Sequence, residues 1–209
     1  MRPTSRLSVV STVTFLLVWS LAPAAATQTS RTDVSKAGND LSNIQIENFG
    51  RVNDSYYRGG QPDDDDYADL AALGVKTLIN LTSDDAKANE RALVERTGMT
   101  YVQIPMTTHE QPTPDKVAEF LKIVNDPARL PVYVHCVGGR HRTGVMSAIY
   151  RMTHDSWTSE QAYKEMKRYK FGADFLHPEF KSFVYGYRSD AAHPADSRAV
   201  VATAPKSGS

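Results

Sequence analysis

The sequence predicts an α/β fold: a single three-layer domain in which helices flank a mainly parallel central sheet. Short apolar segments of strand length alternate with helical segments from about residue 44 to residue 188, as βαβ units require. Two of the apolar runs, residues 76–81 and 131–135, are nearly continuous, which is typical of strands buried on both faces. With 209 residues, the chain is long enough for one domain with a substantial core.

The domain is expected to open with two strands and a helix. Residues 44–52 and 55–58 form short β-like runs around an Asn-Asp turn. Residues 62–73 should form a helix, because acidic residues stand in its first turn and Gly74 follows its end.

A second strand–helix–strand unit follows. Residues 76–81 form the central apolar strand, and residues 84–96, rich in Ala, Leu and Glu, predict a helix that Gly98 closes. Residues 100–105 then predict the next strand.

The second half of the domain has the clearest helix signals. Thr113 is a suitable N-cap, Pro114 suits the first helical position, and Asp115 favours the positive end of the helix dipole. This helix should end near residue 126. The later elements expected are a strand at 131–135 and helices at 143–152, 159–169 and 177–187.

The first 26 residues predict a secretory signal peptide. Arg2 and Arg6 give a basic start, residues 7–21 are mostly apolar, and residues 24–26 are small enough for cleavage. An uncleaved membrane anchor is the alternative, but the apolar stretch is shorter than the roughly 20 residues that span a bilayer. We therefore expect an exported protein, periplasmic or secreted.

The remaining boundaries follow from composition. Residues 27–43 are polar and predict a flexible lead-in, residues 44–188 form the domain, and residues 189–209 lack periodicity and predict a disordered tail. Lys and Arg number 24, as do Asp and Glu, so no overall field favours nucleic acid, or a membrane once the signal peptide is removed. We expect a monomer.

Cys136 is the only cysteine. It has no partner for an internal disulfide, and an unpaired thiol in an oxidising compartment indicates a chemical role.

Residues 135–144 combine the features that a thiolate needs in order to attack a phosphate. Five residues separate Cys136 from Arg142, and Gly138 and Gly139 permit a curl in which backbone N–H groups converge on an oxyanion. The helix that follows adds the positive end of its dipole, which favours both the anion and the thiolate. Arg142 can hold two phosphate oxygens with its planar fork.

This pattern resembles the signature loop of the protein tyrosine phosphatase superfamily, His-Cys-x-x-Gly-x-x-Arg-Ser/Thr. Its fixed positions here are His135, Cys136, Gly139, Arg142 and Thr143. The inner sequence Gly-Arg-His-Arg-Thr-Gly is similar to the small atypical dual-specificity branch of plants, fungi and bacteria. Residues 48–52, 57–62 and 73–81 match the opening strands of that branch, and the resemblance covers about residues 44–188.

The resemblance implies a role for each loop residue. Cys136 would form a phosphocysteine that water hydrolyses, and Thr143 would bond the sulfur as it leaves, although a helix-capping role is also open. His135 would be a buried residue that holds the loop. The residues expected to surround the phosphate are Val137, Gly138, Gly139, Arg140, His141 and Arg142. Arg140 and His141 could instead form a solvated charged rim.

The proton donor to the leaving group departs from the superfamily pattern. In the superfamily an Asp about 30 residues before the cysteine does this, a task worth about 10²–10⁴-fold in rate. Residues 104–112 contain no Asp, and His109 and Glu110 are the nearest titratable residues. Asp115 ranks third, because a position in the first turn of a helix explains it.

Two further groups of residues bear on the site. The segment with Tyr57, Arg58 and Gln61 lies near the site in this branch, where Arg58 would either bind substrate or form a structural ion pair. We expect no metal or cofactor. The acids at residues 63–66 are explained by a helix start, and no other oxygen ligands follow at suitable spacing. His154 and His177 likewise lack ligand partners, so surface or packing roles suffice for them.

The expected function is hydrolysis of phosphomonoesters, on phosphotyrosyl or mixed protein substrates, through a cysteinyl-phosphate. An inositol phosphate or pyrophosphate phosphatase is the alternative that Arg140 and His141 motivate, although Val137 stands where that branch often has Lys. Sulfur transfer is disfavoured because rhodanese loops are usually shorter. A non-catalytic domain that binds phosphoproteins is a further alternative, because residues 104–112 lack the Asp that donates the proton in the superfamily.

Overall fold

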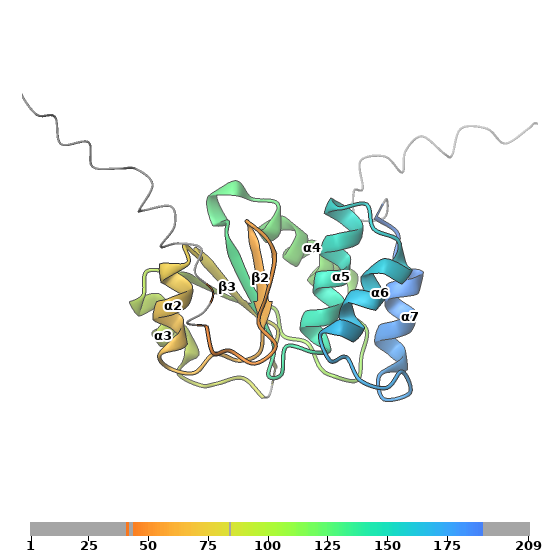
Figure 1. Cartoon of the computed structure of the whole chain (residues 1–209), viewed down its shortest axis with the longest axis horizontal. Coiled ribbons are helices and arrows are strands. Elements are labelled where there is room, and N and C mark those ends of the chain that lie inside the picture. Colours follow the sequence, from red (N-terminus) through yellow and green to blue (C-terminus); the bar gives the residue numbers. More distant parts are fainter. Residues whose placement is uncertain (1–40, 42–43, 84, 190–209) are drawn as a thin grey trace, which may run out of the picture.

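The computed structural model describes residue 41 and residues 44–83 and 85–189 (Figure 1). The expected signal peptide and nearly all of the expected lead-in and tail lie outside these residues. No helix within the described residues has the length and apolar character to cross a membrane.

One mixed sheet forms the centre of the domain, as predicted. Its strand order is β1-β2-β5-β3-β4, with β1 antiparallel to β2 and all other neighbours parallel. The strands are β1 Gly50–Asn53, β2 Tyr56–Gly59, β3 Thr77–Asn80, β4 Thr100–Gln103 and β5 Val132–His135. Because β5 lies between β2 and β3, the carboxyl ends of three parallel strands meet beside the residue that follows His135.

Helices cover both faces of the sheet, which gives the expected three layers (Figure 1). On one face, α2 (Asp66–Ala72) and α3 (Glu90–Arg96) pack against Tyr57, Leu78 and Tyr133 in one buried cluster. On the other face, the helices α4 to α7 pack against Tyr56 and Ile79 in a second cluster. Neighbouring residues of one strand therefore point to opposite layers, so the strands are buried on both sides.

The helices after residue 110 agree closely with the prediction. They are α4 Pro114–Val124, α5 Arg142–His154, α6 Ser159–Arg168 and α7 Pro178–Gly186, with a 3-10 turn η1 at Pro127–Arg129. Thr113 caps α4 through its side chain, and Asp115 lies in the first turn, as expected. A capping box formed by Thr158 and Gln161 fixes the start of α6.

The first half of the domain departs from the prediction at three element starts. Strand β1 begins at Gly50 instead of residue 44, because Asn48 adopts a positive φ of 58° and turns the chain. Helix α2 spans Asp66–Ala72 and begins four residues later than expected. Helix α3 spans Glu90–Arg96 and begins six residues later, so residue 85 lies in a loop rather than a helix. These displaced segments all lie near the carboxyl ends of the strands.

Candidate active site

The signature loop joins the end of β5 to the start of α5. Cys136 is the first residue after the strand, and only 3% of its surface is exposed. Arg142, six positions later, begins α5, which points its N-terminus at the loop. A sulfur at the carboxyl edge of a parallel sheet and beneath a helix N-terminus is placed where such folds bind anions.

Gly139 is required by the path of this loop. Its φ is 63°, and a Cβ built on it would lie 2.4 Å from the carbonyl carbon of Gly59 at the end of β2. No side chain fits at that separation. Glycine at this position therefore lets the loop press directly on the neighbouring strand.

Three hydrogen bonds from neighbouring segments fix the carbonyl groups of the loop. Arg58 Nη2 donates to the Gly139 carbonyl at 2.6 Å, and Asn48 Nδ2 donates to the same oxygen at 2.9 Å. The backbone N–H of Gln61 donates to the Val137 carbonyl at 2.8 Å. Turning the carbonyls outward in this way leaves the amide side of the loop free to face an anion.

Arg58 thus has a structural role, although not the ion pair considered from the sequence. It is fully buried, and its guanidinium stacks over the ring of Tyr169 with 3.8 Å to the centroid. Its hydrogen bond goes to the loop backbone, so it positions the loop from behind.

Arg142 holds a carboxylate with both arms of its guanidinium. Nη1 and Nη2 donate to the two oxygens of Asp85 at 2.9 and 2.6 Å, and Nη1 also donates to the Met106 carbonyl at 3.1 Å. The hydrogen bonds from Arg142 hold the pKa of Asp85 below its ordinary value. This two-pronged geometry is the one expected for a phosphate.

The sequence analysis missed Asp85 because it placed this residue inside a helix. A signal was present: the polar residues 82–85 follow one residue after the end of β3, and the carboxyl edge of a parallel sheet is where ligand-contacting residues gather. The loop between β3 and α3 belongs to the site.

The side chains of Arg140 and His141 are engaged with protein groups. Arg140 Nη2 lies 2.5 Å from a carboxylate oxygen of Glu47. His141 Nε2 is 3.1 Å from the Phe171 carbonyl, and burial, together with the nearby His177, lowers the pKa of His141 to about 4. Neither side chain offers a free positive charge to substrate, and His141 is uncharged at neutral pH.

Thr143 and His135 lie within the buried shell around Cys136. Thr143 is fully buried, and its Oγ1 forms no hydrogen bond within residues 44–83 and 85–189. His135 is also fully buried, as expected, and its Nε2 lies 3.2 Å from Oε1 of Glu90. Glu90 is a second residue that sequence reasoning missed, since a glutamate at a helix start usually faces solvent.

The two candidate proton donors lie on the exposed loop after β4. His109 faces His177, with 6.4 Å between their ring centroids, and His177 in turn lies 3.9 Å from the ring of His141. Nδ1 of His177 also lies 2.9 Å from the Thr108 carbonyl. The structure therefore ties His109 to the signature loop through His177, a residue for which a packing role was expected.

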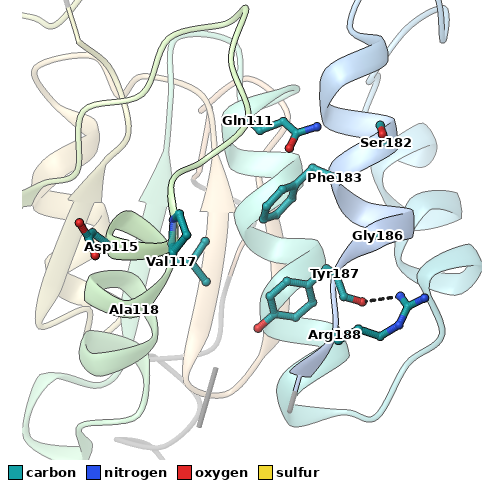
Figure 2. Close-up of a pocket in the computed structure, with 10 residues that line it drawn as sticks. Gln111, Asp115, Val117, Ala118, Ser182, Phe183, Gly186, Tyr187 and Arg188 are labelled. Carbon is teal, nitrogen blue, oxygen red and sulfur yellow. Dashed lines mark hydrogen bonds between the residues drawn. The ribbon is translucent and has the colours of Figure 1, made fainter. Parts of the chain in front are cut away.

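Glu110 is exposed, and its Oε2 accepts a hydrogen bond of 3.5 Å from Thr107. Asp115 lies elsewhere, on the wall of a groove of about 660 Å³ between α4 and α7 (Figure 2). Val117, Phe183 and Tyr187 give this groove an apolar lining, and Cys136 and Arg142 take no part in it. Within the described residues, no three His, Cys, Asp or Glu side chains are grouped as a metal site would require.

Comparisons with known proteins agree with this geometry. Residues 35–182 match the family described as "DSP-PTPase phosphatase fused to NAD+ Kinase". The chain belongs to this phosphatase family.

Two curated relatives carry the same activity class in their names. "Probable tyrosine-protein phosphatase DG1060" of Dictyostelium discoideum is 32% identical over 126 residues, which are 58% of this chain and 75% of the relative. "Dual specificity protein phosphatase TpbA" of Pseudomonas aeruginosa is 30% identical over 143 residues, 66% of this chain and 62% of the relative. More than a third of the second relative therefore lies outside the match.

A solved structure extends the likeness to the fold. The core catalytic domain of the PP-IP phosphatase SIW14 from Saccharomyces cerevisiae, in complex with citrate, has a TM-score of 0.61 and 25% identity. The match covers 70% of this chain and 89% of that domain. The protein is a hydrolase of the cysteine-dependent phosphatase class, with an atypical dual-specificity domain.

Proposed function

We propose that this protein is an exported phosphatase that removes phosphate from phosphorylated protein side chains, phosphotyrosine first among them. The observation that carries the proposal is the bidentate grip of Arg142 on a carboxylate beside the buried Cys136. A phosphoryl group held by Arg142 in the same way would lie in the signature loop that also carries Cys136.

The reaction follows from the residues around that position. The Cys136 thiolate attacks phosphorus, so an S–P bond forms while the P–O bond to the substrate breaks, and the departing oxygen takes a proton from a donor on the loop after β4. Water then attacks the cysteinyl-phosphate, and the sulfur leaves. Thr143 is suited to bond that sulfur, because its buried Oγ1 is otherwise unpaired within the described residues.

The charges around the site favour a substrate with one phosphate over a crowded polyphosphate. Arg140 is paired with Glu47, and Lys170 lies 3.8 Å from the same carboxylate. His141 is neutral at pH 7, since burial lowers its pKa to about 4. Val137, at the loop rim, leaves 48% of its surface exposed, where an apolar contact suits a tyrosyl ring or peptide better than a second phosphate.

The location and assembly of the protein belong to the same proposal. The basic, apolar and small-residue regions of residues 1–26 support export to a periplasm or beyond, with no membrane attachment after cleavage. We expect a monomer, which gel filtration of the mature protein would test.

A substrate panel on the mature protein tests the function. Phosphotyrosyl peptide should be turned over at a higher kcat/KM than inositol hexakisphosphate or an inositol pyrophosphate. The likeness to SIW14 makes the reverse order the leading alternative, and that order would overturn the proposed substrate class.

The nucleophile is tested separately. Cys136→Ser should reduce kcat on p-nitrophenyl phosphate by at least about 10³-fold while phosphotyrosyl peptide still binds. If wild type binds the peptide but hydrolyses neither compound under reducing conditions, a binding domain replaces the enzyme.

A further inference from the structure

An acidic side chain lies between two cations at the edge of the signature loop. Glu47 Oε1 lies 2.5 Å from Arg140 Nη2 and 3.8 Å from Lys170 Nζ. The two cations come from separate parts of the chain, because Arg140 belongs to the signature loop and Lys170 follows the end of α6. One carboxylate oxygen therefore takes the place between them that an external anion could occupy.

The backbone of Glu47 is fastened to the end of the strand beside the signature loop. The N–H of Gly60, which follows β2, donates to the Glu47 carbonyl at 2.8 Å. A Cβ built on Gly60 would lie 3.1 Å from that carbonyl oxygen and 3.0 Å from the Val137 carbonyl oxygen. Since Val137 directly follows Cys136, the Glu47 backbone lies close to the loop that carries the nucleophile.

The Arg140 side chain lies over the signature loop itself. A Cβ built on Gly138 would lie 3.3 Å from Arg140 Nε and 3.6 Å from its Cγ and Cδ, so the side chain folds back across the Gly138 backbone. Arg140 Nε is buried and forms no hydrogen bond within the part of the chain that the structure describes. The positive charge of Arg140 is therefore kept beside the loop that would hold the reacting phosphate.

Lys170 is placed beside Glu47 by an uncommon backbone conformation. Its φ is 59°, in the left-handed region that glycine adopts most readily after a helix end. The carbonyl of the preceding Tyr169 accepts a hydrogen bond from Asn48 Nδ2 at 2.8 Å, and the Tyr169 ring stacks on Arg58. A lysine in a conformation that suits glycine better indicates that its side chain has a role at this position.

The group of Glu47, Arg140 and Lys170 adds little to the stability of the fold. Its three side chains are exposed, and exposed ion pairs contribute little to the free energy of unfolding. The hydrogen bond from Arg140 holds the pKa of Glu47 below its ordinary value, so the carboxylate is ionised at neutral pH. The main consequence of Glu47 is therefore local, because its negative charge offsets the positive charges that border the signature loop.

We propose that Glu47 is a specificity-determining residue, whose carboxylate occupies a second anion position between Arg140 and Lys170 and so disfavours substrates that carry a second phosphate. Such a substrate would place one phosphate on Arg142 and the other on the pair of cations. The second phosphate would have to displace Glu47 before it bound. A substrate with one phosphate needs no such displacement. The inference deepens the proposed function and rests on it for the reacting phosphate at Cys136.

The test uses Glu47→Gln, which keeps the size of the side chain and removes its charge. Titration calorimetry gives the Kd of inositol hexakisphosphate, a probe with neighbouring phosphates, and the Kd of inorganic phosphate. The variant should bind inositol hexakisphosphate about 3–10-fold more tightly than wild type, and inorganic phosphate less than about twofold more tightly, because the lost charge lies at the second position. An equal gain for both anions, or no gain, would overturn the proposal.

Asp54→Asn is the matched control for net charge. Asp54 pairs with Arg51 in the turn between β1 and β2, at the opposite end of β2 from Gly60. The substitution removes one negative charge, as Glu47→Gln does, but it frees no cation beside the signature loop. It should change neither Kd by more than about twofold. If it tightens the binding of inositol hexakisphosphate as much as Glu47→Gln does, the overall charge sets the preference and the proposal is wrong.

Substitution of the two cations separates their occupation by Glu47 from simple repulsion. The gain from Glu47→Gln should fall to about twofold in an Arg140→Gln background and should vanish when Lys170→Gln is added. A full gain without the two cations would show that Glu47 only repels anions, and the proposed second position would then be wrong.

These binding measurements require no turnover, so they are independent of the proposed substrate. The proposed function fails if wild type hydrolyses an inositol pyrophosphate at a higher kcat/KM than phosphotyrosyl peptide. The inference about Glu47 fails if Glu47→Gln leaves the ratio of the two dissociation constants unchanged. The two failures are therefore distinguishable.

Discussion

Arg142 grips a carboxylate of its own chain in the way that it would grip a phosphate. The Asp85 side chain is 40% exposed, whereas the Arg142 side chain is 4% exposed, so the carboxylate reaches in from a surface loop to a fixed guanidinium. A substrate phosphate must therefore share the Arg142 guanidinium with Asp85 or displace the Asp85 carboxylate. Asp85 is a poor candidate for the proton donor, because the hydrogen bonds from Arg142 lower its pKa and keep it ionised.

Replacing Asp85 by Asn should therefore tighten anion binding. We expect the inhibition constant of inorganic phosphate and the KM of p-nitrophenyl phosphate to fall by about 3–10-fold. A charge-assisted hydrogen-bonded pair is worth about 1.5–3 kcal/mol, and the exposure of Asp85 reduces the share of this energy that an anion must overcome at Arg142. Because Asp85 stays ionised well above its lowered pKa, the gain should be constant from pH 5.5 to 8.

Asp64→Asn supplies the control for net charge. Asp64 is a surface acid paired with Lys87, so its loss changes the overall charge equally without freeing Arg142. A raised KM in Asp85→Asn would mean that the carboxylate orients Arg142 and does not compete with substrate.

At the scale of elements, the loop between β4 and α4 is fastened at two points. Arg142 binds the Met106 carbonyl at 3.1 Å, and His177 contacts the Thr108 carbonyl at 2.9 Å. The next residue, His109, is exposed and lies on the side of His177. These contacts favour His109 over Glu110 as the proton donor.

His109→Gln should lower kcat for phosphotyrosyl peptide by about 10²-fold and leave p-nitrophenyl phosphate nearly unaffected, because p-nitrophenolate needs no proton to depart. Glu110→Gln should cost less than about threefold on either substrate. Equal losses on both substrates in His109→Gln would instead indicate a disturbed loop.

The contact between the signature loop and β2 leads to another expectation. Gly139→Ala should reduce kcat/KM by about 10²-fold or more, because its Cβ would meet the Gly59 backbone at 2.4 Å and shift the loop, and a 1 Å misplacement costs about that much. Gly138 is the matched position. There, a Cβ would meet only the flexible Arg140 side chain, at 3.3 Å, so Gly138→Ala should cost at least tenfold less. Similar losses would show that the two glycines contribute equally to the loop conformation that turns the backbone N–H groups toward the anion.

Elements with local signals were predictable from the sequence, and elements without them were not. The cap and proline before α4 predicted its start correctly, and the apolar run at 131–135 predicted β5. The helix predicted at 84–96 included residues 84–89 because the whole segment is rich in Ala, Leu and Glu, which are good helix formers. The contact between Asp85 and Arg142, which lie 57 positions apart, outweighs that propensity and has no local signature.

At the scale of the whole molecule, the site likewise consists of residues that have a local sequence signal and residues that have none. The nucleophile and its arginine share one short motif, so their chemistry could be inferred from spacing alone. Asn48, Gln61 and Glu90 come from segments far from the motif, and they meet it only because β2 and β3 flank β5 in the sheet. The fold therefore supplies the support of the loop, and the motif supplies the reacting groups.

The packing of α7 against the signature loop gives the molecule a stability that depends on pH. Burial, and next the nearby His177, lower the pKa of His141 to about 4. An unfolded chain, with an ordinary value near 6.5, binds the proton more tightly. Stability should therefore fall as the pH drops from about 6.5 to 4, because protons favour the unfolded state in that window.

His141→Gln isolates this effect, since glutamine can still donate to the Phe171 carbonyl without titrating. Ionised Asp85 and Glu90 also lose their partners in acid, so both proteins should become less stable, but wild type should do so more steeply. Between pH 6.5 and 4, its Tm should fall by roughly 2–4 °C more than that of the variant, which is the shift that about 1 kcal/mol gives in a chain of this size. The full pKa difference would give more, but His141 is only half-buried and solvent screening reduces its contribution. Parallel Tm curves would mean that His141 is as accessible to protons in the folded protein as in the unfolded chain, and the contact between α7 and the loop would then be loose in solution.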